Sequence, residues 1–229
     1  MSANENTTYV RLYTTRHGED LHRVEISPNN RAATRQAIID EIRSKGVNFI
    51  TRSDWSAKHY SENDMEVDWD FTKIAIHHAG RSAACGVGHF QMQDIQKEHM
   101  DNPHIKGDIG YHYALDCSGR IYEGRDIRFK GSNVGAYNTG LIGIVLLENL
   151  TNTSDSLGSV FSTTVSSVPS IQKQTANVLI TALKNHFYIN ILGGHREFPN
   201  QGSEGKICPG NIGMNFVYEL RRSFGLSAP

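Results

Sequence analysis

The pattern of apolar and polar positions along this chain predicts a β-sheet with helices packed on it. Short apolar runs of strand length occur at residues 72–78, 141–147 and 189–192. Apolar positions recur at helical spacing over residues 88–100, 171–187 and 212–224. Two further runs flank Ser118-Gly119, a pair typical of a tight turn. We therefore expect an α/β fold in which a central mixed β-sheet is flanked by helices.

The N-terminal part of the chain carries a pattern of its own. Residues 8–26 alternate apolar and polar side chains in two runs, which predicts a β-hairpin. Residues 31–45 place isoleucines on one helical face, and Gly46 ends that helix. We accordingly divide the chain into a small β-β-α appendage, residues 1–48, and a main domain, residues 49–229.

Composition and charge exclude several classes of protein. The 229 residues carry a formal net charge of −1 and no run of Lys or Arg, which argues against a nucleic-acid partner. No apolar stretch reaches the ~20 residues that a membrane span needs. The N-terminus is polar and lacks the pattern of a signal peptide, so we expect synthesis in the cytoplasm without a leader. A Ser/Thr-rich span at residues 151–170 indicates a surface insertion.

The 3 cysteines are too few for a disulfide framework. The sequence leaves open whether Cys85 and Cys117 form a bridge. Cys208 lies apart from both, in a loop between Lys206 and Pro209-Gly210.

Histidines stand where two predicted strands end. One strand stops at His77-His78, and another leads through Gly194 to His195. Adjacent residues of a strand point to opposite faces, so His77 and His78 are not expected to serve one ion together. Two histidines and Cys208 would make a three-ligand zinc set with a fourth position open, which is the composition of a catalytic site.

The histidines, Cys208, Lys206 and a further candidate, Tyr111, also have simpler interpretations. A histidine at a strand end can be a hydrogen-bonded core residue, and Cys208 can be a small buried hydrophobe. Lys206 can be a solvated surface lysine, and Tyr111 a core tyrosine with its hydroxyl bonded. The long ligand spacing is a weak zinc signal by itself, because His-Glu-X-X-His and Cys-X-X-Cys are both absent.

Several blocks, taken together and in order, resemble the type 2 N-acetylmuramoyl-L-alanine amidases. That family includes the phage T7-type lysozyme amidase and the peptidoglycan recognition proteins. The resemblance covers about residues 50–225. The blocks are Arg52-Ser-Asp-Trp-Ser-Ala57, Ile76-His-His78, Asp108-Ile-Gly-Tyr-His-Tyr113, Gly119-Arg-Ile-Tyr-Glu-Gly-Arg125, Gly143-Ile144, Gly194-His-Arg196 and Lys206-Ile-Cys-Pro-Gly210.

The resemblance implies a zinc-containing groove and a role for each matching residue. His77, His195 and Cys208 would hold Zn²⁺, and Tyr111 with Lys206 would form the catalytic pair. The implied activity is hydrolysis of the amide bond between N-acetylmuramic acid and L-alanine of the stem peptide of peptidoglycan. Residues that would face or support the substrate groove are His78, His112, Asn138, His99 and Asp108.

Two rival functions stay open at this stage. One is a non-catalytic module that binds peptidoglycan, and the other is a cysteine hydrolase that pairs Cys208 with His195. Recognition proteins generally carry a disulfide just after the histidine strand, and only Cys85 lies there, which favours a bacterial or phage-like amidase.

The lack of a leader raises the question of how the protein reaches its substrate. A bacteriolytic, antimicrobial role on the cell wall, in the periplasm or outside the cell, would then follow lysis or dedicated export. The protein would be a phage endolysin or an exported effector. An effector would also imply a cognate inhibitor, or immunity protein, that plugs the groove.

Overall fold

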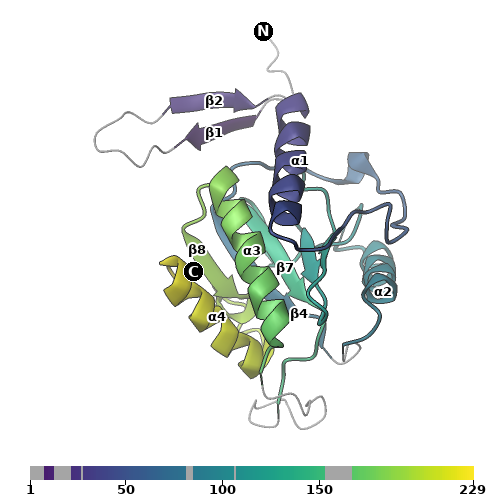
Figure 1. The fold of residues 1–229 in the computed structure, drawn as a ribbon, viewed down its shortest axis with the longest axis vertical. Coiled ribbons are helices and arrows are strands. Elements are labelled where there is room, and N and C mark those ends of the chain that lie inside the picture. The colour runs from purple at the N-terminus through teal and green to yellow at the C-terminus, as the bar shows by residue number, and fades with distance from the viewer. Residues whose placement is uncertain (1–7, 13–21, 27, 81–84, 106, 153–166) are drawn as a thin grey trace.

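The protein is built around one mixed β-sheet (Figure 1). We analysed a computed structural model, which describes residues 8–12, 22–26, 28–80, 85–105, 107–152 and 167–229. The strands are, in spatial order, β3 (Phe49–Ile50), β6 (Ile121–Glu123), β5 (Tyr113–Leu115), β7 (Leu141–Leu146), β4 (Lys73–His78) and β8 (Ile191–Gly194). All neighbours pair in parallel except β5 and β6, which form the antiparallel hairpin expected around Ser118-Gly119. The predicted α/β class and mixed sheet are confirmed.

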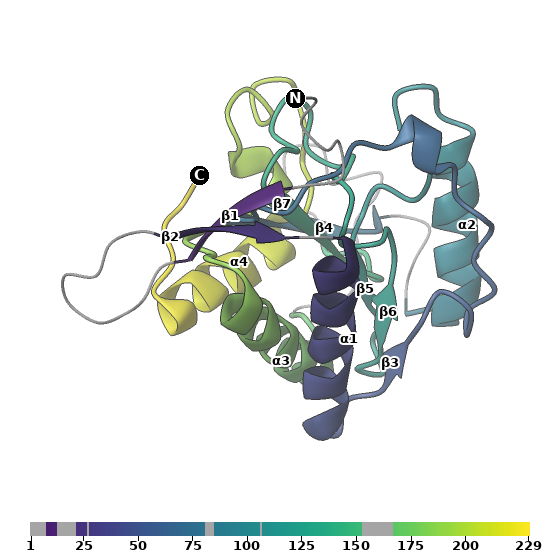
Figure 2. The ribbon, with the colours of Figure 1, turned by 90° about the horizontal axis from the view of Figure 1, so that it is seen from above.

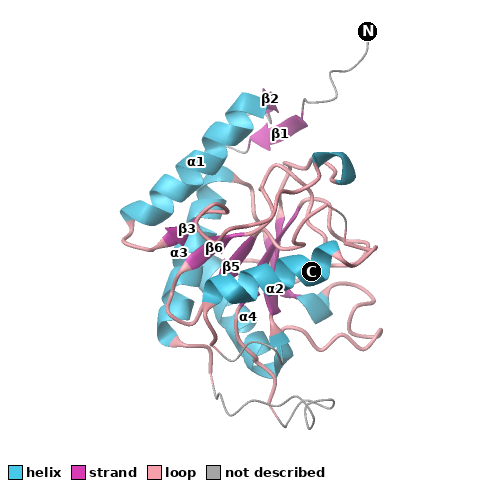
Figure 3. Ribbon diagram, turned by 90° about the vertical axis from the view of Figure 1, so that its right-hand side faces the viewer, coloured by secondary structure: helices cyan, strands magenta, loops and turns pink. Residues whose placement is uncertain are grey.

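Helices cover both faces of this sheet (Figures 2 and 3). On one face lie α1 (Pro28–Ser44), α3 (Ser170–His186) and α4 (Gly210–Phe224), which share the main core with Ile74, Ile76 and Ile144. On the other face, Met92 of α2 (Gly88–Met100) packs in a second core with Trp55, Tyr122 and Val145. Alternate residues of β7 therefore enter different cores, as expected for a strand buried on both sides.

The N-terminal hairpin and helix form as predicted. β1 (Thr8–Leu12) and β2 (His22–Ile26) make a separate two-stranded antiparallel sheet, and α1 follows. The α1 isoleucines Ile38, Ile39 and Ile42 lie in the main core, and Arg35 forms an ion pair with Glu123 of β6. The division of the chain at residue 48 stays a prediction, but α1 shares the core of the sheet.

One predicted strand is displaced along the chain. The apolar run at 189–192 predicted a strand there, but β8 begins at Ile191 and includes Gly193 and Gly194. A Cβ atom on Gly194 would lie 2.4 Å from the sulfur of Met214, so this strand end needs a residue without a side chain. The prediction counted only apolar side chains, and glycine has none, so it ended the strand at Leu192 and left out Gly193 and Gly194. Most of the predicted 151–170 insertion lies outside the described residues.

Cys85 and Cys117 form a disulfide, which answers the question that the sequence left open. The bridge joins the segment before α2 to the turn of the β5–β6 hairpin. The partner of Cys85 therefore lies in the hairpin turn and not just after the histidine strand, and the preference for a bacterial or phage-like amidase stays a prediction. None of the described helices is long and apolar enough to cross a membrane.

Breaking this disulfide should lower the stability of the protein. The bridged cysteines are 32 residues apart, and closing a loop of that length is worth about 3–4 kcal/mol in the chain-entropy account. Cys117→Ser should therefore lower the free energy of unfolding by about that amount in urea titrations. Adding a reductant to the wild type should give the same shift, and equal midpoints with and without reductant would contradict the prediction.

Candidate functional site

Three side chains meet at the carboxyl edge of the parallel strands. His77 lies near the end of β4, and His195 follows β8 directly and opens the 3₁₀ helix His195–Glu197. Ile76 pairs with Gly194 in the sheet, so the residues that follow this pair, His77 and His195, lie close together. Cys208 arrives from the loop before α4. One ligand atom from each residue can be chosen so that all lie within 4.8 Å of one another.

The contacts inside this cluster orient the ligand atoms. Cys208 Sγ lies 3.6 Å from His77 Nδ1, and the rings of His77 and His195 have centroids 4.7 Å apart. Burial lowers the pKa of both histidines, which favours the neutral imidazole that binds metals. Burial also raises the pKa of the Cys208 thiol to about 12, a tendency that a bound cation opposes. Two imidazole nitrogens and a thiol sulfur are donors that suit Zn²⁺, so this set fits the metal.

A cavity of about 670 Å³ opens beside the cluster. His195, Tyr111 and Lys206 all contribute to its wall. The Tyr111 ring lies 4.8 Å from the His77 ring between centroids, and burial raises the pKa of its hydroxyl. Lys206 is exposed, and its charge adds to the burial that lowers the pKa of His195. The site therefore combines a phenol and an ammonium group with the three clustered donors.

The residues predicted to face substrate behave differently from one another. His112 is fully buried, with Nε2 on the Phe129 carbonyl at 2.9 Å and Nδ1 accepting from the Gly143 N–H at 3.1 Å. Both ring nitrogens are thus used by the backbone, and the substrate-facing interpretation of His112 is corrected to a structural one. His78 Nδ1 accepts the Leu150 N–H at 3.0 Å.

Asn138 does line the cavity, as the sequence suggested for a substrate-facing residue. Its side-chain oxygen, however, accepts the backbone N–H groups of both Asn133 and Val134 at 2.8 Å. Asn138 therefore shapes the loop on the cavity wall, and direct contact of its side chain with substrate stays a prediction.

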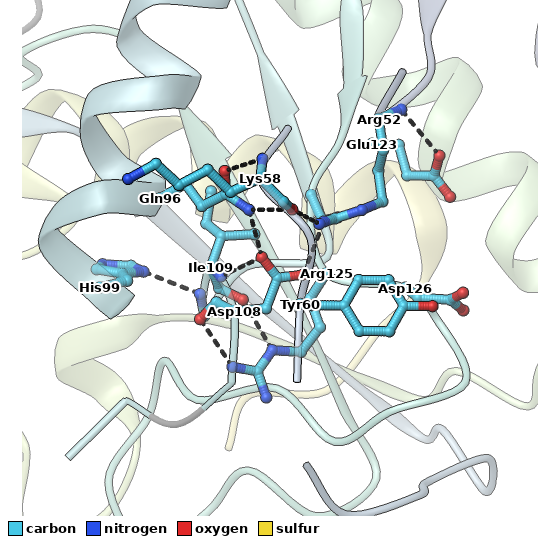
Figure 4. A network of polar contacts seen from close by, with 12 residues as sticks. Arg52, Lys58, Tyr60, Gln96, His99, Asp108, Ile109, Glu123, Arg125 and Asp126 are labelled. Atoms are coloured by element: carbon cyan, nitrogen blue, oxygen red, sulfur yellow. Dashed lines mark hydrogen bonds and ion pairs between the residues drawn. The ribbon is translucent and has the colours of Figure 1, made fainter. Parts of the chain in front are cut away.

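A polar network holds the segment that leads to Tyr111 (Figure 4). The buried carboxylate of Asp108 pairs with Arg52 at 2.7 Å and accepts a hydrogen bond from Gln96 at 2.7 Å. Arg125 donates to the carbonyl oxygens of Asp108 at 3.0 Å and Ile109 at 2.7 Å. His99 lines the cavity, and its Nδ1 accepts the Gly110 N–H at 2.9 Å. Asp108 and His99 therefore hold the segment that leads to Tyr111, and their part in the substrate groove stays a prediction.

Two residues of the site were missed by the sequence analysis. Asn133 and Gln201 place side-chain amide oxygens against Nε2 of His77 and His195, at 3.0 and 3.1 Å. Neutral amides in loops carry no motif, and only the folded chain brings them to the histidines.

The fold is that of the peptidoglycan recognition proteins. The crystal structure of Drosophila peptidoglycan recognition protein SD aligns with a TM-score of 0.61 and 22% identity, over 79% of this chain and 97% of that one. Recognition protein LE, in complex with tracheal cytotoxin, a monomeric diaminopimelic acid-type peptidoglycan, aligns with a TM-score of 0.61 and 17% identity. That alignment covers 78% of this chain and 95% of that one.

Sequence comparison supplies the family. The sequence model of the N-acetylmuramoyl-L-alanine amidase family matches residues 68–211. The chain is also 36% identical over 106 residues to peptidoglycan-recognition protein SD of Drosophila melanogaster, covering 45% of this chain and 56% of that protein. It thus spans about half the length of the curated relatives it matches. The chain belongs to the N-acetylmuramoyl-L-alanine amidase family.

Proposed function

We propose that the protein is a zinc-dependent peptidoglycan hydrolase that cleaves the amide bond between N-acetylmuramic acid and L-alanine of the stem peptide. The observation that carries this proposal is the convergence of His77, His195 and Cys208 beside a cavity that also presents Tyr111 and Lys206. A protein that only binds a ligand has no need of such a donor set. The family supports the same chemistry.

The positions of the side chains support a role for each of them. His77, His195 and Cys208 would hold Zn²⁺. When bound, the ion would supply Lewis acidity and lower the pKa of a coordinated water to about 7. Lys206, on the cavity wall, would stabilise the negative oxygen that develops as the amide carbonyl becomes tetrahedral. The Tyr111 hydroxyl would donate a hydrogen bond to the same intermediate. The wide cavity leaves room for both glycan and peptide around the scissile bond.

A non-catalytic binding module is the second candidate. The similar proteins named above are recognition proteins, and one of them is described with a peptidoglycan fragment bound. In this alternative the cavity would hold the stem peptide without cutting it. A thiol hydrolase is the third, although the structure places Cys208 Sγ against Nδ1 of His77, whereas the sequence-based hypothesis paired the thiol with His195.

We also infer that the protein acts outside the cytoplasm, where peptidoglycan lies. The Cys85–Cys117 disulfide supports this inference, because disulfides persist in oxidising compartments. An endolysin or an exported effector would both act there. The effector version additionally requires an inhibitor that fills the cavity, and a pull-down that recovers no neighbour-encoded binder would count against it.

Digestion of purified peptidoglycan tests the proposal directly. We expect free stem peptides that begin at L-alanine, detected by mass, and we expect a chelator to remove this activity and added Zn²⁺ to restore it. Binding of muropeptides without cleavage would favour the recognition module. Cleavage that persists in chelator but stops on thiol alkylation would favour the thiol hydrolase.

A further inference from the structure

We propose that Asn133 and Gln201 are positioning residues that fix the tautomer of both histidines and present their Nδ1 atoms to the metal. The inference about the metal rests on the proposed function, whereas the inference about the tautomer concerns the protein alone. Each carboxamide accepts the Nε2–H of one imidazole, and neither brings a charge to the site.

Asn133 is held in one orientation by its surroundings. Its Oδ1 lies 3.0 Å from His77 Nε2, while its Nδ2 donates to the Gly110 carbonyl at 2.9 Å. The second contact identifies which end of the amide is the oxygen, because a carbonyl accepts only from the NH₂ group. A Cβ atom on Gly143 or Gly131 would lie 2.5 Å from this side chain, so two glycines make room for it.

Gln201 repeats the arrangement on the other histidine. Its Oε1 lies 3.1 Å from His195 Nε2, and its Nε2 faces the Gly135 carbonyl at 3.4 Å. The side chain is almost fully buried, with 5% of the residue exposed. Both amides thus direct NH₂ to a backbone carbonyl and oxygen to an imidazole, in two loops that are far apart in sequence.

The tautomer decides which nitrogen can bind a cation. A neutral imidazole that carries its proton on Nε2 has its lone pair on Nδ1. In His77 this is the nitrogen that faces Cys208 Sγ, at 3.6 Å. Partners of this kind typically orient ligand rings and tune their basicity, and losing one typically costs about 10–100-fold in metal affinity.

The neutrality of the two amides has a consequence of its own. With two neutral imidazoles and one thiolate, a divalent ion keeps one net positive charge for the substrate carbonyl. A carboxylate in place of either amide would accept the same N–H and strengthen the histidine as a ligand, but it would cancel that charge. The amides therefore favour reactivity of the metal over tightness of its binding.

The first test is nitrogen NMR of the metal-free wild-type protein near neutral pH. Imidazole ¹⁵N shifts and couplings should show the proton on Nε2 in both His77 and His195. A proton on Nδ1 in either ring would overturn the inference. This measurement needs neither zinc nor activity, so a wild type that binds no zinc would end the proposed function while the tautomers still decide this inference.

The second test compares two variants of nearly equal size at one position. Gln201→Met removes the acceptor and should weaken Zn²⁺ by about 10–100-fold in competition with a chromophoric chelator. Gln201→Glu keeps the acceptor and should hold Zn²⁺ at least as tightly as the wild type, but with a lower kcat on peptidoglycan. Unchanged zinc affinity and tautomer in Gln201→Met would overturn the inference.

Asn133→Leu should give the same loss of zinc affinity through His77. Because this change also removes the bond to the Gly110 carbonyl, its unfolding curve must be measured alongside. Asn102→Ala is the matched control, since this carboxamide lines the same cavity and accepts the His104 backbone N–H at 2.9 Å. It should leave both zinc affinity and the histidine tautomers unchanged.

Discussion

Cys208→Ser is expected to abolish amidase activity and to weaken zinc binding by at least about 100-fold. Losing a residue that only hydrogen-bonds to a metal ligand costs up to about 100-fold in affinity, and losing a ligand should cost more. A serine hydroxyl stays protonated near neutral pH and offers no anionic sulfur to the ion. The side chain lies against His77 Nδ1 and the His78 backbone N–H, so the change removes the sulfur atom at the centre of the proposed zinc site. Zinc content after gel filtration and product release from peptidoglycan measure the two effects.

Cys208→Asp distinguishes a metal ligand from a nucleophile at this position. A carboxylate is an accepted zinc ligand, so this variant should retain more zinc than Cys208→Ser and some hydrolysis. A thiol hydrolase would lose all activity in both variants. If Cys208→Ser kept both its zinc and its rate, the assignment of Cys208 to the metal would be wrong.

The central sheet and its helices were predictable because each depends on local pattern. The apolar stretch of β7 and the periodic positions of α2 and α3 are signals within a few residues of one another. His77 and His195 were also recognisable as strand-end residues, although 118 positions separate them. Parallel pairing of β4 with β8 then does what the sequence could not display, since it sets the two ends side by side.

The hydrogen bonds of the site histidines and of His112 could not be predicted, because the segments that they join carry no common sequence motif. His112 looked like a groove residue beside Tyr111, yet the side chain is fully buried and both its ring nitrogens meet backbone groups. Asn133 and Gln201 gained their roles only from the placement of two loops. Neutral polar residues in loops are too common for sequence alone to single them out.

Tyr111→Phe is expected to lower kcat on peptidoglycan by about 10²–10³, the usual cost of one donor to a developing oxyanion. The phenyl ring should keep its place 4.8 Å from the His77 ring, so zinc affinity and stability should hardly change. Only the hydroxyl is lost, at a residue whose segment is fixed by the Gly110 N–H bond to His99 and the Arg125 N–H bond to the Tyr111 carbonyl.

Tyr218→Phe makes the same chemical change on an exposed position of α4, 44% exposed and outside the cavity lining, and should leave the rate unaltered. Comparison with Lys206→Ala then assigns the charge stabilisation. If Tyr111→Phe retains the full rate with zinc bound while Lys206→Ala loses it, the ammonium group alone stabilises the oxyanion. If both lose it, with zinc binding intact, the phenol and the ammonium group both stabilise the same transition state.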